Sequence, residues 1–302
     1  MRKIKPPKKS KSNLKITAGY IVKNEEKNLP RSIESLKAAV DEIVVVDTGS
    51  TDKTIEVAKN YGAKVVETVW QDDFSTPRNL AIENSTGDWI IMIDADEFFI
   101  KPKKVRAAVE SISNTDAIFM LRIDIDEDNG NKELNRDYYL RAFRNVNYLR
   151  YRGLIHENVE NINGGDLKYV IAGEELTLHH TGYSETKAEH KLRRNLAIIN
   201  SEIQQIGIQP RHHIALVDCY FALDDYEKAF QHAQALLDSG IRPITGLAVF
   251  YRKTLYAMQQ LRCPIEQILK ILDEALRNFP KDEEFLTKHK IISDYLKQNA
   301  KR

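Results

Sequence analysis

Cysteine is scarce in this sequence of 302 residues: only Cys219 and Cys263 are present, and they lack the spacing of a metal site. This scarcity argues against a disulfide framework and favours a reducing, cytoplasmic setting. Long apolar runs are missing too, since none approaches the roughly 20 residues that span a bilayer. The formal net charge is only +1, which does not favour nucleic acid as a partner of the whole chain.

Glycine is missing from the first predicted strand-to-helix turn, Ile21–Asn28. A dinucleotide-binding fold needs glycines there, so that a pyrophosphate can approach the backbone. Asp47 follows the second predicted strand, as the ribose-binding acid of such folds does, but the glycine-free turn argues against a dehydrogenase. A nucleotidyltransferase is disfavoured for a similar reason, because the chain has no glycine-rich signature near its start.

The remaining composition is that of an ordinary soluble globular protein, with 42% apolar and 29% charged residues and a length that suits two domains. Residues 1–14 are basic and lack the apolar segment of a secretory signal, which predicts a flexible, solvated tail. The alternative is that this tail contacts an anionic membrane surface, as in a peripheral protein at the inner membrane face.

Strand-like and helical patterns alternate through the first part of the chain. Buried strands are predicted at residues 15–22, 42–47, 63–69 and 89–97. Alternation of this kind predicts a Rossmann-like, mostly parallel sheet that is covered by helices on both sides. Ligands of such sheets bind beyond the carboxyl ends of the strands, where Lys23, Asp47 and the Asp94/Asp96 pair all fall. We therefore expect these residues to form one site.

The run Trp89–Glu97 ends in two carboxylates that are one residue apart. If the strand continues to Glu97, Asp94 and Asp96 point to the same side of the sheet. Two hard oxygen ligands at this position suit a divalent cation that also holds substrate phosphates. The alternative interpretation is a strand that runs out into a solvated acidic loop.

Five motifs occur in a fixed order: Ile21–Glu26, Val45–Asp52, Asp73–Asn79, Gly87–Trp89 and Asp94–Glu97. In this order they resemble the motifs of family 2 glycosyltransferases, which are inverting enzymes of the GT-A fold with nucleotide-sugar donors. The resemblance covers residues 15–183. It is greatest to lipooligosaccharide glucosyltransferases and to the peptide S-glycosyltransferases of bacteriocin clusters. It implies a UDP-sugar donor and a glycan, lipid or peptide acceptor.

The resemblance also implies roles for single residues. Seven are implied to bind the nucleotide-sugar: Ile21, Lys23, Glu25, Asp47, Arg78, Asp94 and Ala95. Asp47 would accept a hydrogen bond from the uracil N3–H, and Arg78 would approach the diphosphate. The alternatives are that Asp47 only caps the turn after it and that Arg78 is a solvated helix residue.

An inverting transfer needs a base that takes the proton of the acceptor nucleophile. In the resembling family this base is a carboxylate downstream of the metal motif, which implies Glu157, with His156 orienting it or contacting phosphate. Asp126 and Asp128 are reserve candidates, and His156 has the alternative of a structural histidine. The Gln-x-x-Arg-Trp motif of processive members is absent, which argues against a polymer synthase.

Another strand is predicted at residues 176–183, and two histidines, His179 and His180, lie near its end. Similar enzymes carry a His-x-Gly-Tyr here, which implies that His180 completes the metal site with Asp96. Alternation along the strand would turn His179 to the opposite face. The implied cofactor is a divalent cation, Mn²⁺ or Mg²⁺, and an imidazole ligand suits manganese better.

From residue 184 onwards the pattern is helical. Helices are predicted at residues 185–206, 212–222, 226–239, 245–260, 264–278 and 281–298. Their small and aromatic positions resemble those of a tetratricopeptide (TPR) repeat. The sequence therefore predicts a GT-A domain at residues 15–183 and an all-α, TPR-like domain at 184–302. The helical domain would bind an acceptor peptide or pair with itself in a homodimer. A helical-repeat adaptor with a non-catalytic nucleotide-sugar-binding domain is the alternative function.

Overall fold

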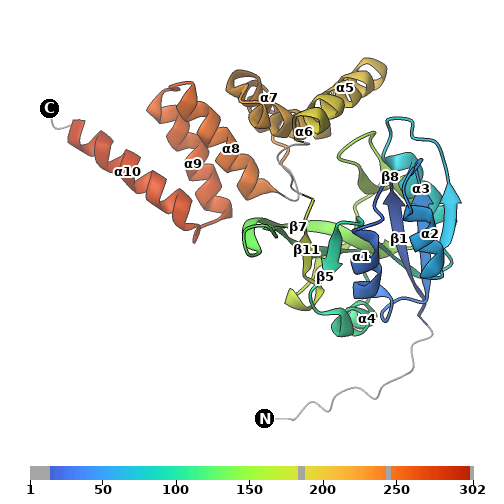
Figure 1. Cartoon of the computed structure of the whole chain (residues 1–302). Helices are drawn as coiled ribbons and strands as arrows, with labels where there is room; N and C mark the ends of the chain where they lie inside the picture. Colours follow the sequence, from blue (N-terminus) through green and yellow to red (C-terminus); the bar gives the residue numbers. More distant parts are fainter. Residues whose placement is uncertain (1–13, 183–187, 243–245, 300–302) are drawn as a thin grey trace, which may run out of the picture. The chain divides into compact units, whose positions relative to one another are not determined.

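The structure, a computed structural model of the chain, describes residues 14–182, 188–242 and 246–299. The chain divides into two compact units. The first contains all strands of the described residues and helices α1–α4, and the second contains helices α5–α10 together with Leu154–His156. Figure 1 shows the elements of each unit.

The first unit has the alternating strands and helices that the sequence predicts. Its elements are β1 (Ile16–Val22), α1 (Leu29–Leu36), β2 (Glu42–Asp47), α2 (Thr54–Asn60), β3 (Lys64–Glu67), α3 (Ser75–Glu83), β4 (Trp89–Met92), β5 (Glu97–Phe99), α4 (Pro102–Ser111), β6 (Ala117–Asp126), β7 (Lys132–Arg144), β8 (Leu149–Arg152), β9 (Asn158–Asn161), β10 (Tyr169–Ile171) and β11 (Leu178–His180). A short 3-10 helix at Glu174–Leu176 precedes β11.

These strands form a nine-stranded mixed sheet in the order β3-β2-β1-β4-β7-β6-β11-β5, with β10 beside β6, while β8 and β9 form a separate hairpin. Strands β1–β4 pair in parallel. Strand β7 is antiparallel to both β4 and β6, so β6 runs in the direction of β4, and β11 is parallel to β6. The carboxyl ends of β2, β4, β6 and β11 therefore lie at the same edge of the sheet.

Alternating side chains of the strands build a core on each face of this sheet. In β4, Trp89 and Ile91 pack with α1 and α4 on one face, while Ile90 and Met92 pack with α3 and the β8–β9 hairpin on the other. All four side chains are fully buried. An apolar strand without polar alternation is what two covered faces require. The sheet edge is thereby fixed in a rigid, three-layered unit.

The predicted strand at residues 89–97 is wrong beyond Met92. The chain turns at Asp94–Asp96, with the Glu97 N–H donating to the Asp94 carbonyl at 3.0 Å, and only then enters β5. Strand alternation therefore does not decide where Asp94 and Asp96 point. Polar residues after an apolar run favour such a turn, and the antiparallel pairing of β5 with β11 stabilises it.

The motif Gly87–Trp89 lies at the amino-terminal end of β4, away from the ligand-binding edge. A Cβ atom on Gly87 would meet the Thr17 backbone nitrogen at 2.7 Å, and Asp88 accepts a hydrogen bond from the Lys15 N–H at 2.8 Å. These contacts join the start of β4 to β1. This motif is therefore structural and does not contribute to the site.

The second unit consists of α5 (Ala188–Ile206), α6 (Pro210–Ala222), α7 (Tyr226–Asp238), α8 (Leu247–Gln260), α9 (Ile265–Asn278) and α10 (Glu283–Asn299). Each helix packs against the next, and α6 also contacts α8. Small and large apolar side chains fill the core: Ala233, Tyr251, Leu272, Ala275 and Phe285 are fully buried. The predicted helices are confirmed within the described residues, and the predicted starts at 185 and 245 lie outside them.

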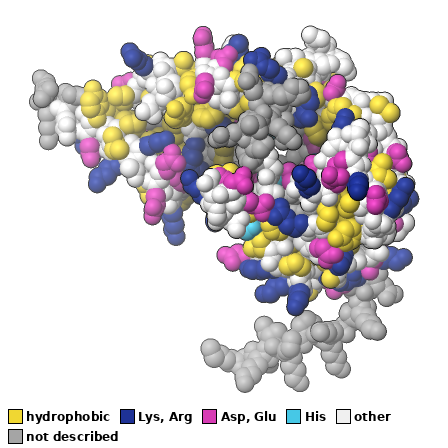
Figure 2. Space-filling model, viewed as in Figure 1, with side chains coloured by type: hydrophobic (Ala, Val, Ile, Leu, Met, Phe, Trp, Pro, Cys, Tyr) yellow, Lys and Arg dark blue, Asp and Glu magenta, His cyan; other side chains and the backbone are white. Residues whose placement is uncertain are grey.

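Neither unit presents a face of one charge in the view of Figure 2, where basic and acidic side chains are interspersed. Within the described chain, no helix combines the length and the apolar composition that a bilayer span requires. Both cysteines are free thiols, Cys219 buried and Cys263 half-buried.

Candidate active site

Asp47 ends β2 at the ligand-binding edge and is 1% exposed. Its Oδ1 atom accepts hydrogen bonds from the N–H groups of Gly49, at 2.9 Å, and Ser50, at 2.7 Å. Its Oδ2 atom is buried and has no hydrogen-bond partner. One oxygen of Asp47 therefore caps the turn, and the other is an unused acceptor. A buried acceptor without a partner is costly unless a ligand supplies the donor.

The loops after β1 and β2 are bound to each other beside Asp47. The Asn24 N–H donates to the Ser50 hydroxyl at 2.9 Å, and the Asn24 side-chain oxygen accepts the Thr51 N–H at 2.7 Å. Asn24 adopts a φ of 58°, in the left-handed region, and the N-cap of α1 is Asn28. Four of the predicted donor-binding positions are on these loops or strand ends: Ile21, Lys23, Glu25 and Asp47. Lys23 is exposed, and Ile21 is half-buried.

Arg78 is a buried residue of α3, with a side chain that is 8% exposed. Its Nε donates to Glu157 Oε1 at 2.5 Å, and its Nη2 donates to Asp94 Oδ1 at 2.9 Å. Its guanidinium also lies 5.4 Å from the centroid of the Tyr151 ring. The alternative of a solvated helix residue is therefore wrong, because Arg78 bridges two carboxylates that the sequence analysis placed in the site.

The neighbouring motif residue Asn79 fixes the segment that leads to Glu157. Its side-chain amide donates to the Tyr151 carbonyl at 3.0 Å, and its side-chain oxygen accepts the Tyr151 N–H at 2.9 Å. Ser75 donates to the Gly153 carbonyl at 2.6 Å. The motif Asp73–Asn79 thus ties α3 to β8 and to the residues that follow it.

Asp94 lies between two arginines: its Oδ2 atom accepts a hydrogen bond from Arg141 Nη2 at 2.9 Å, opposite the bond from Arg78. Burial alone would raise the pKa of Asp94, but the charges of Arg78 and Arg141 hold this pKa well below its usual range. Asp94 is therefore a permanent carboxylate that orients two guanidinium groups. Ala95, the residue between the two acids, is 5% exposed.

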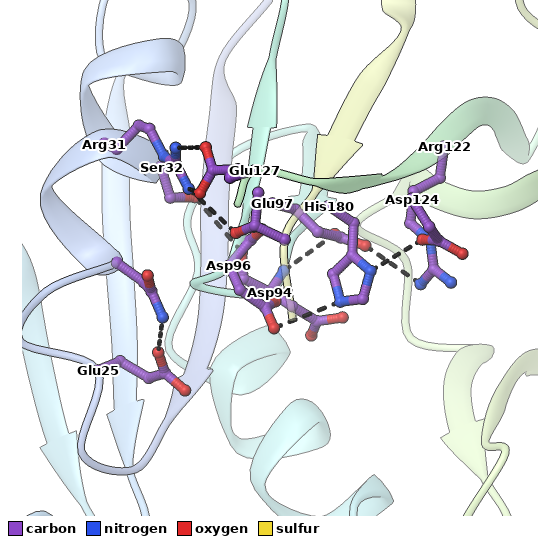
Figure 3. Close-up of polar contacts among 12 residues, drawn as sticks. Glu25, Arg31, Ser32, Asp94, Asp96, Glu97, Arg122, Asp124, Glu127 and His180 are labelled. Carbon is purple, nitrogen blue, oxygen red and sulfur yellow. Dashed lines mark hydrogen bonds and ion pairs between the residues drawn. The ribbon is translucent and has the colours of Figure 1, made fainter. Parts of the chain in front are cut away.

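The structure brings Asp96 and His180 together, as predicted for the metal site. His180 Nε2 lies 3.3 Å from Asp96 Oδ2, and His180 Nδ1 lies 2.8 Å from Asp124 Oδ1. Figure 3 shows the imidazole between these two carboxylates. Burial would lower the pKa of His180, but the hydrogen bonds with Asp124 and Asp96 raise it to about 9. His179, one residue earlier, packs edge-on against Phe98.

Gly182 keeps this pair accessible. A Cβ atom at this position would lie 2.2 Å from Asp96 Oδ2 and 2.7 Å from His180 Nε2. Any larger residue would therefore occupy the space in front of both atoms. Among the described residues, no group of three or more His, Cys, Asp or Glu side chains could hold a metal ion. Asp96 and His180 would provide two ligands, and a substrate would have to supply others.

The base candidates differ in their surroundings. Glu157 is 11% exposed and bound to Arg78. His156 is exposed, has φ 52 and belongs to the second compact unit. The reserve candidates Asp126 and Asp128 flank the turn between β6 and β7, where Asp126 accepts a hydrogen bond from Asn129 at 2.5 Å. Glu157 is thus joined to Arg78 and, through Arg78, to Asp94.

Four buried or nearly buried charged residues beneath the site were not predicted: Glu97, Arg122, Asp124 and Arg141. Glu97 pairs with Arg141, Arg122 lies 3.0 Å from Asp124, and Asp124 contacts His180. Charged residues within otherwise apolar strand patterns were the available signal. A charge is rarely buried unless a partner compensates it.

The family match falls almost entirely within the first unit. Residues 20–166 match the family described as Glycosyl transferase family 2. A TPR repeat-containing protein of Synechococcus elongatus is 39% identical over 142 residues, which are 47% of this chain and 34% of that protein. The SPbeta prophage-derived glycosyltransferase SunS of Bacillus subtilis is 32% identical over 209 residues, which are 65% of this chain and 46% of that protein. The chain thus spans less than half the length of these relatives.

A solved structure of glucosyl-3-phosphoglycerate synthase from Mycobacterium tuberculosis, in complex with Mn²⁺, UDP-glucose and phosphoglyceric acid, also matches. It is 23% identical, with a TM-score of 0.33, over 38% of this chain and 45% of that chain. The family match and the observed sheet order confirm the resemblance and the fold class inferred from the five motifs, a GT-A-like α/β domain followed by helices.

Proposed function

We propose that this chain, in which residues 20–166 form a Glycosyl transferase family 2 domain, transfers a sugar from a UDP-sugar to an acceptor with inversion. The observation that carries this proposal is the approach of Asp96 and His180 to 3.3 Å at the sheet edge that also holds Asp47. Strands far apart in sequence bring these residues together, which a purely structural domain does not require.

Asp47 supports a nucleotide-sugar that contains uracil. Its buried Oδ2 atom lacks a hydrogen-bond donor, and the N3–H of uracil can serve as that hydrogen-bond donor. Because Oδ1 is already used by Gly49 and Ser50, the second oxygen has a fixed direction. Lys23, on the adjoining loop, is exposed and provides a positive charge near the nucleotide.

Asp96 and His180 would hold a divalent cation. The pair offers one carboxylate oxygen and one imidazole nitrogen, and Gly182 leaves space in front of both. When bound, the cation would neutralise charge on the leaving diphosphate. The ligand set suits Mn²⁺ better than Mg²⁺ because it includes an imidazole.

The reaction is a single displacement. The acceptor hydroxyl or thiol attacks the anomeric carbon, the bond from that carbon to the diphosphate oxygen breaks, and UDP leaves with the electron pair. Glu157 takes the proton of the nucleophile, while Arg78 fixes its orientation through the hydrogen bond from Nε. Arg78 Nη1 is buried and has no partner, and it is the donor left over for a phosphate oxygen.

The helical unit would contact the acceptor. Its last helix, α10, exposes large apolar side chains, with Ile291 64% and Tyr295 54% exposed. Apolar side chains at this level of exposure suit contact with a peptide or lipid acceptor or with a second copy of the chain.

A donor screen tests the proposal. Release of free sugar or transfer from UDP-sugars is measured with and without Mn²⁺ for the wild type, Asp96→Asn and Gly182→Ala. We expect metal-dependent turnover in the wild type and loss of the metal dependence in both variants. Gly182→Ala should act by filling the space beside Asp96, which displaces the ligand atoms of Asp96 and His180 without removing either side chain. A wild type that binds no UDP and turns over no UDP-sugar would contradict the proposal and favour the adaptor.

A further inference from the structure

Glu97 is the centre of a buried ion-pair network that underlies the site. It is 0% exposed, and its Oε1 atom accepts a hydrogen bond from Arg141 and lies 3.5 Å from Arg122 Nη1. Its Oε2 atom accepts the Asp94 N–H at 3.2 Å. A buried carboxylate with two cations and a backbone donor has its charge fully compensated.

Two branches leave Glu97, and each ends at a residue of the proposed site. One runs through Arg141 and Asp94 to Arg78 and Glu157. The other runs through Arg122 and Asp124 to His180 and Asp96. Positive and negative side chains alternate along both branches up to His180. All of these residues belong to the first unit.

In the first branch, Arg141 is the side chain that joins Glu97 to the Asp94 carboxylate. It precedes Ala142, which pairs with Ile91, so it lies beside the end of β4, where the chain turns towards Asp94. Its Nη2 group donates to both Glu97 and Asp94. The Arg141 side chain is 9% exposed, and it joins the fully buried carboxylate of Glu97 to the partly exposed carboxylate of Asp94.

We propose that Arg141 is a positioning residue for sugar transfer. Held by Glu97, it fixes the Asp94 carboxylate, and Asp94 in turn fixes Arg78 and the Glu157 carboxylate that faces the reaction. This inference rests on the proposed function and extends it to a residue that is buried beneath the site. Misplacement of a reacting group by about 1 Å is enough to lower turnover about 10²-fold.

The test compares Arg141→Lys with Arg144→Lys. Lysine keeps the charge at position 141 but lacks the planar fork that reaches two carboxylates at once. Arg144 is a matched control on the same strand: it donates to the Thr115 carbonyl at 2.9 Å and lies 4.9 Å from the Trp89 ring centroid. Thermal unfolding, UDP affinity by calorimetry, and kcat and KM for the donor are measured for both variants and the wild type.

We expect kcat of Arg141→Lys to fall about 10²-fold in a folded protein, with a smaller loss of UDP affinity because Arg78 is held through Asp94, and we expect kcat and UDP affinity of Arg144→Lys to stay at the wild-type level. Wild-type kcat in a folded Arg141→Lys would overturn the inference, as would equal losses in both variants. If Arg141→Lys does not fold, Arg141→Gln, which removes the charge but keeps hydrogen-bond donors, replaces it with the same criteria. A wild type without UDP binding or turnover would instead refute the proposed function, and the inference would fall with it.

Discussion

The two units of this chain bury different kinds of side chain. In the first, five charged residues are almost completely buried: Asp47, Arg78, Glu97, Asp124 and Arg141. All of them except Asp47 belong to the ion-pair network. In the second, the core is mainly apolar, and among its described residues the buried acidic and basic side chains are Glu202 and His212. Buried ion pairs are weak contributors to net stability. In the first unit, therefore, the buried charged side chains lie at the proposed site, whereas the helices of the second unit are held together by apolar packing.

The largest effect that the comparison predicts is on turnover in the first unit. Glu157→Gln keeps the shape of the side chain but removes the base, so kcat should fall about 10²–10⁴-fold while UDP still binds. Steady-state kinetics and calorimetric titration of UDP measure the two quantities. Glu160→Gln, an exposed change on β9, is the matched control and should leave kcat unchanged. Full activity of Glu157→Gln would remove Glu157 from the mechanism.

The next effect is on stability in the second unit. Phe285, on α10, is 0% exposed and packs in the apolar core with α9 and with Tyr251 of α8, at 6.5 Å between ring centroids. Phe285→Ala should lower the free energy of unfolding of the helical unit by about 3–5 kcal/mol. Denaturant unfolding followed by circular dichroism measures this loss. UDP affinity should stay unchanged. A parallel loss of UDP binding would show that UDP binding by the first unit depends on the stability of the helical unit.

A smaller effect is expected at a helix terminus. Asp225 is the N-cap of α7, and its side chain accepts the Lys228 N–H at 3.2 Å. Asp225→Ala should destabilise the helical unit by about 1 kcal/mol, and Asp225→Asn, which retains a capping oxygen, by less. Thermal unfolding of the two variants gives the comparison. Equal losses in both would mean that the charge of Asp225, rather than its cap, stabilises the helix.

The smallest effect is a pH dependence of the helical unit. His213 and His232 approach to 3.1 Å between their Nδ1 atoms, and burial lowers the pKa of both below 6.5. The unfolded chain therefore binds protons at a higher pH than the folded unit does. Stability is complete above a pH of about 6.5 and decreases as the pH falls through that value.

Unfolding midpoints at pH 7.5 and pH 5.5 measure this decrease. His232→Asn keeps a hydrogen-bonding group beside His213 but does not titrate, so it should reduce the difference between the two midpoints. Some of the difference should remain, because burial lowers the pKa of His212 as well. An identical pH dependence in wild type and variant would contradict the assignment.

Prediction from sequence succeeded where local patterns decide the outcome. Strand β2 was predicted with its observed bounds, Glu42–Asp47, because an apolar run followed by a Thr-Gly-Ser turn leaves little choice. The helix of residues 226–239 was predicted within one residue for a similar reason, an N-cap followed by apolar periodicity. No local pattern decides the meeting of Asp96 with His180: the resemblance implied it, the two side chains lie 3.3 Å apart, and their role as metal ligands stays a prediction.

Prediction failed where contacts distant in sequence decide the outcome. The strand at residues 89–97 ends at Met92 because β5 pairs with β11, which begins far downstream. Asn24 follows a strand and precedes a helix, which favours an N-cap, but its side chain bonds to Thr51 in another loop. The charges of Glu97 and Arg141 interrupt apolar strand patterns, but the sequence does not show which residues pair, and their juxtaposition in the structure reveals the network.

The central claim is that Asp47 binds uracil, and calorimetric titration of UDP and CDP in the presence of Mn²⁺ tests it most directly. In Asp47→Asn, the remaining oxygen is needed by Gly49 and Ser50, so the amide N–H₂ group faces the base. It opposes the N3–H of uracil but can donate to the N3 acceptor of cytosine. The account predicts that the wild type prefers UDP and that the variant loses about tenfold or more in UDP affinity while retaining or gaining affinity for CDP. Equal UDP affinity in both proteins, or no UDP binding by the wild type, would contradict it.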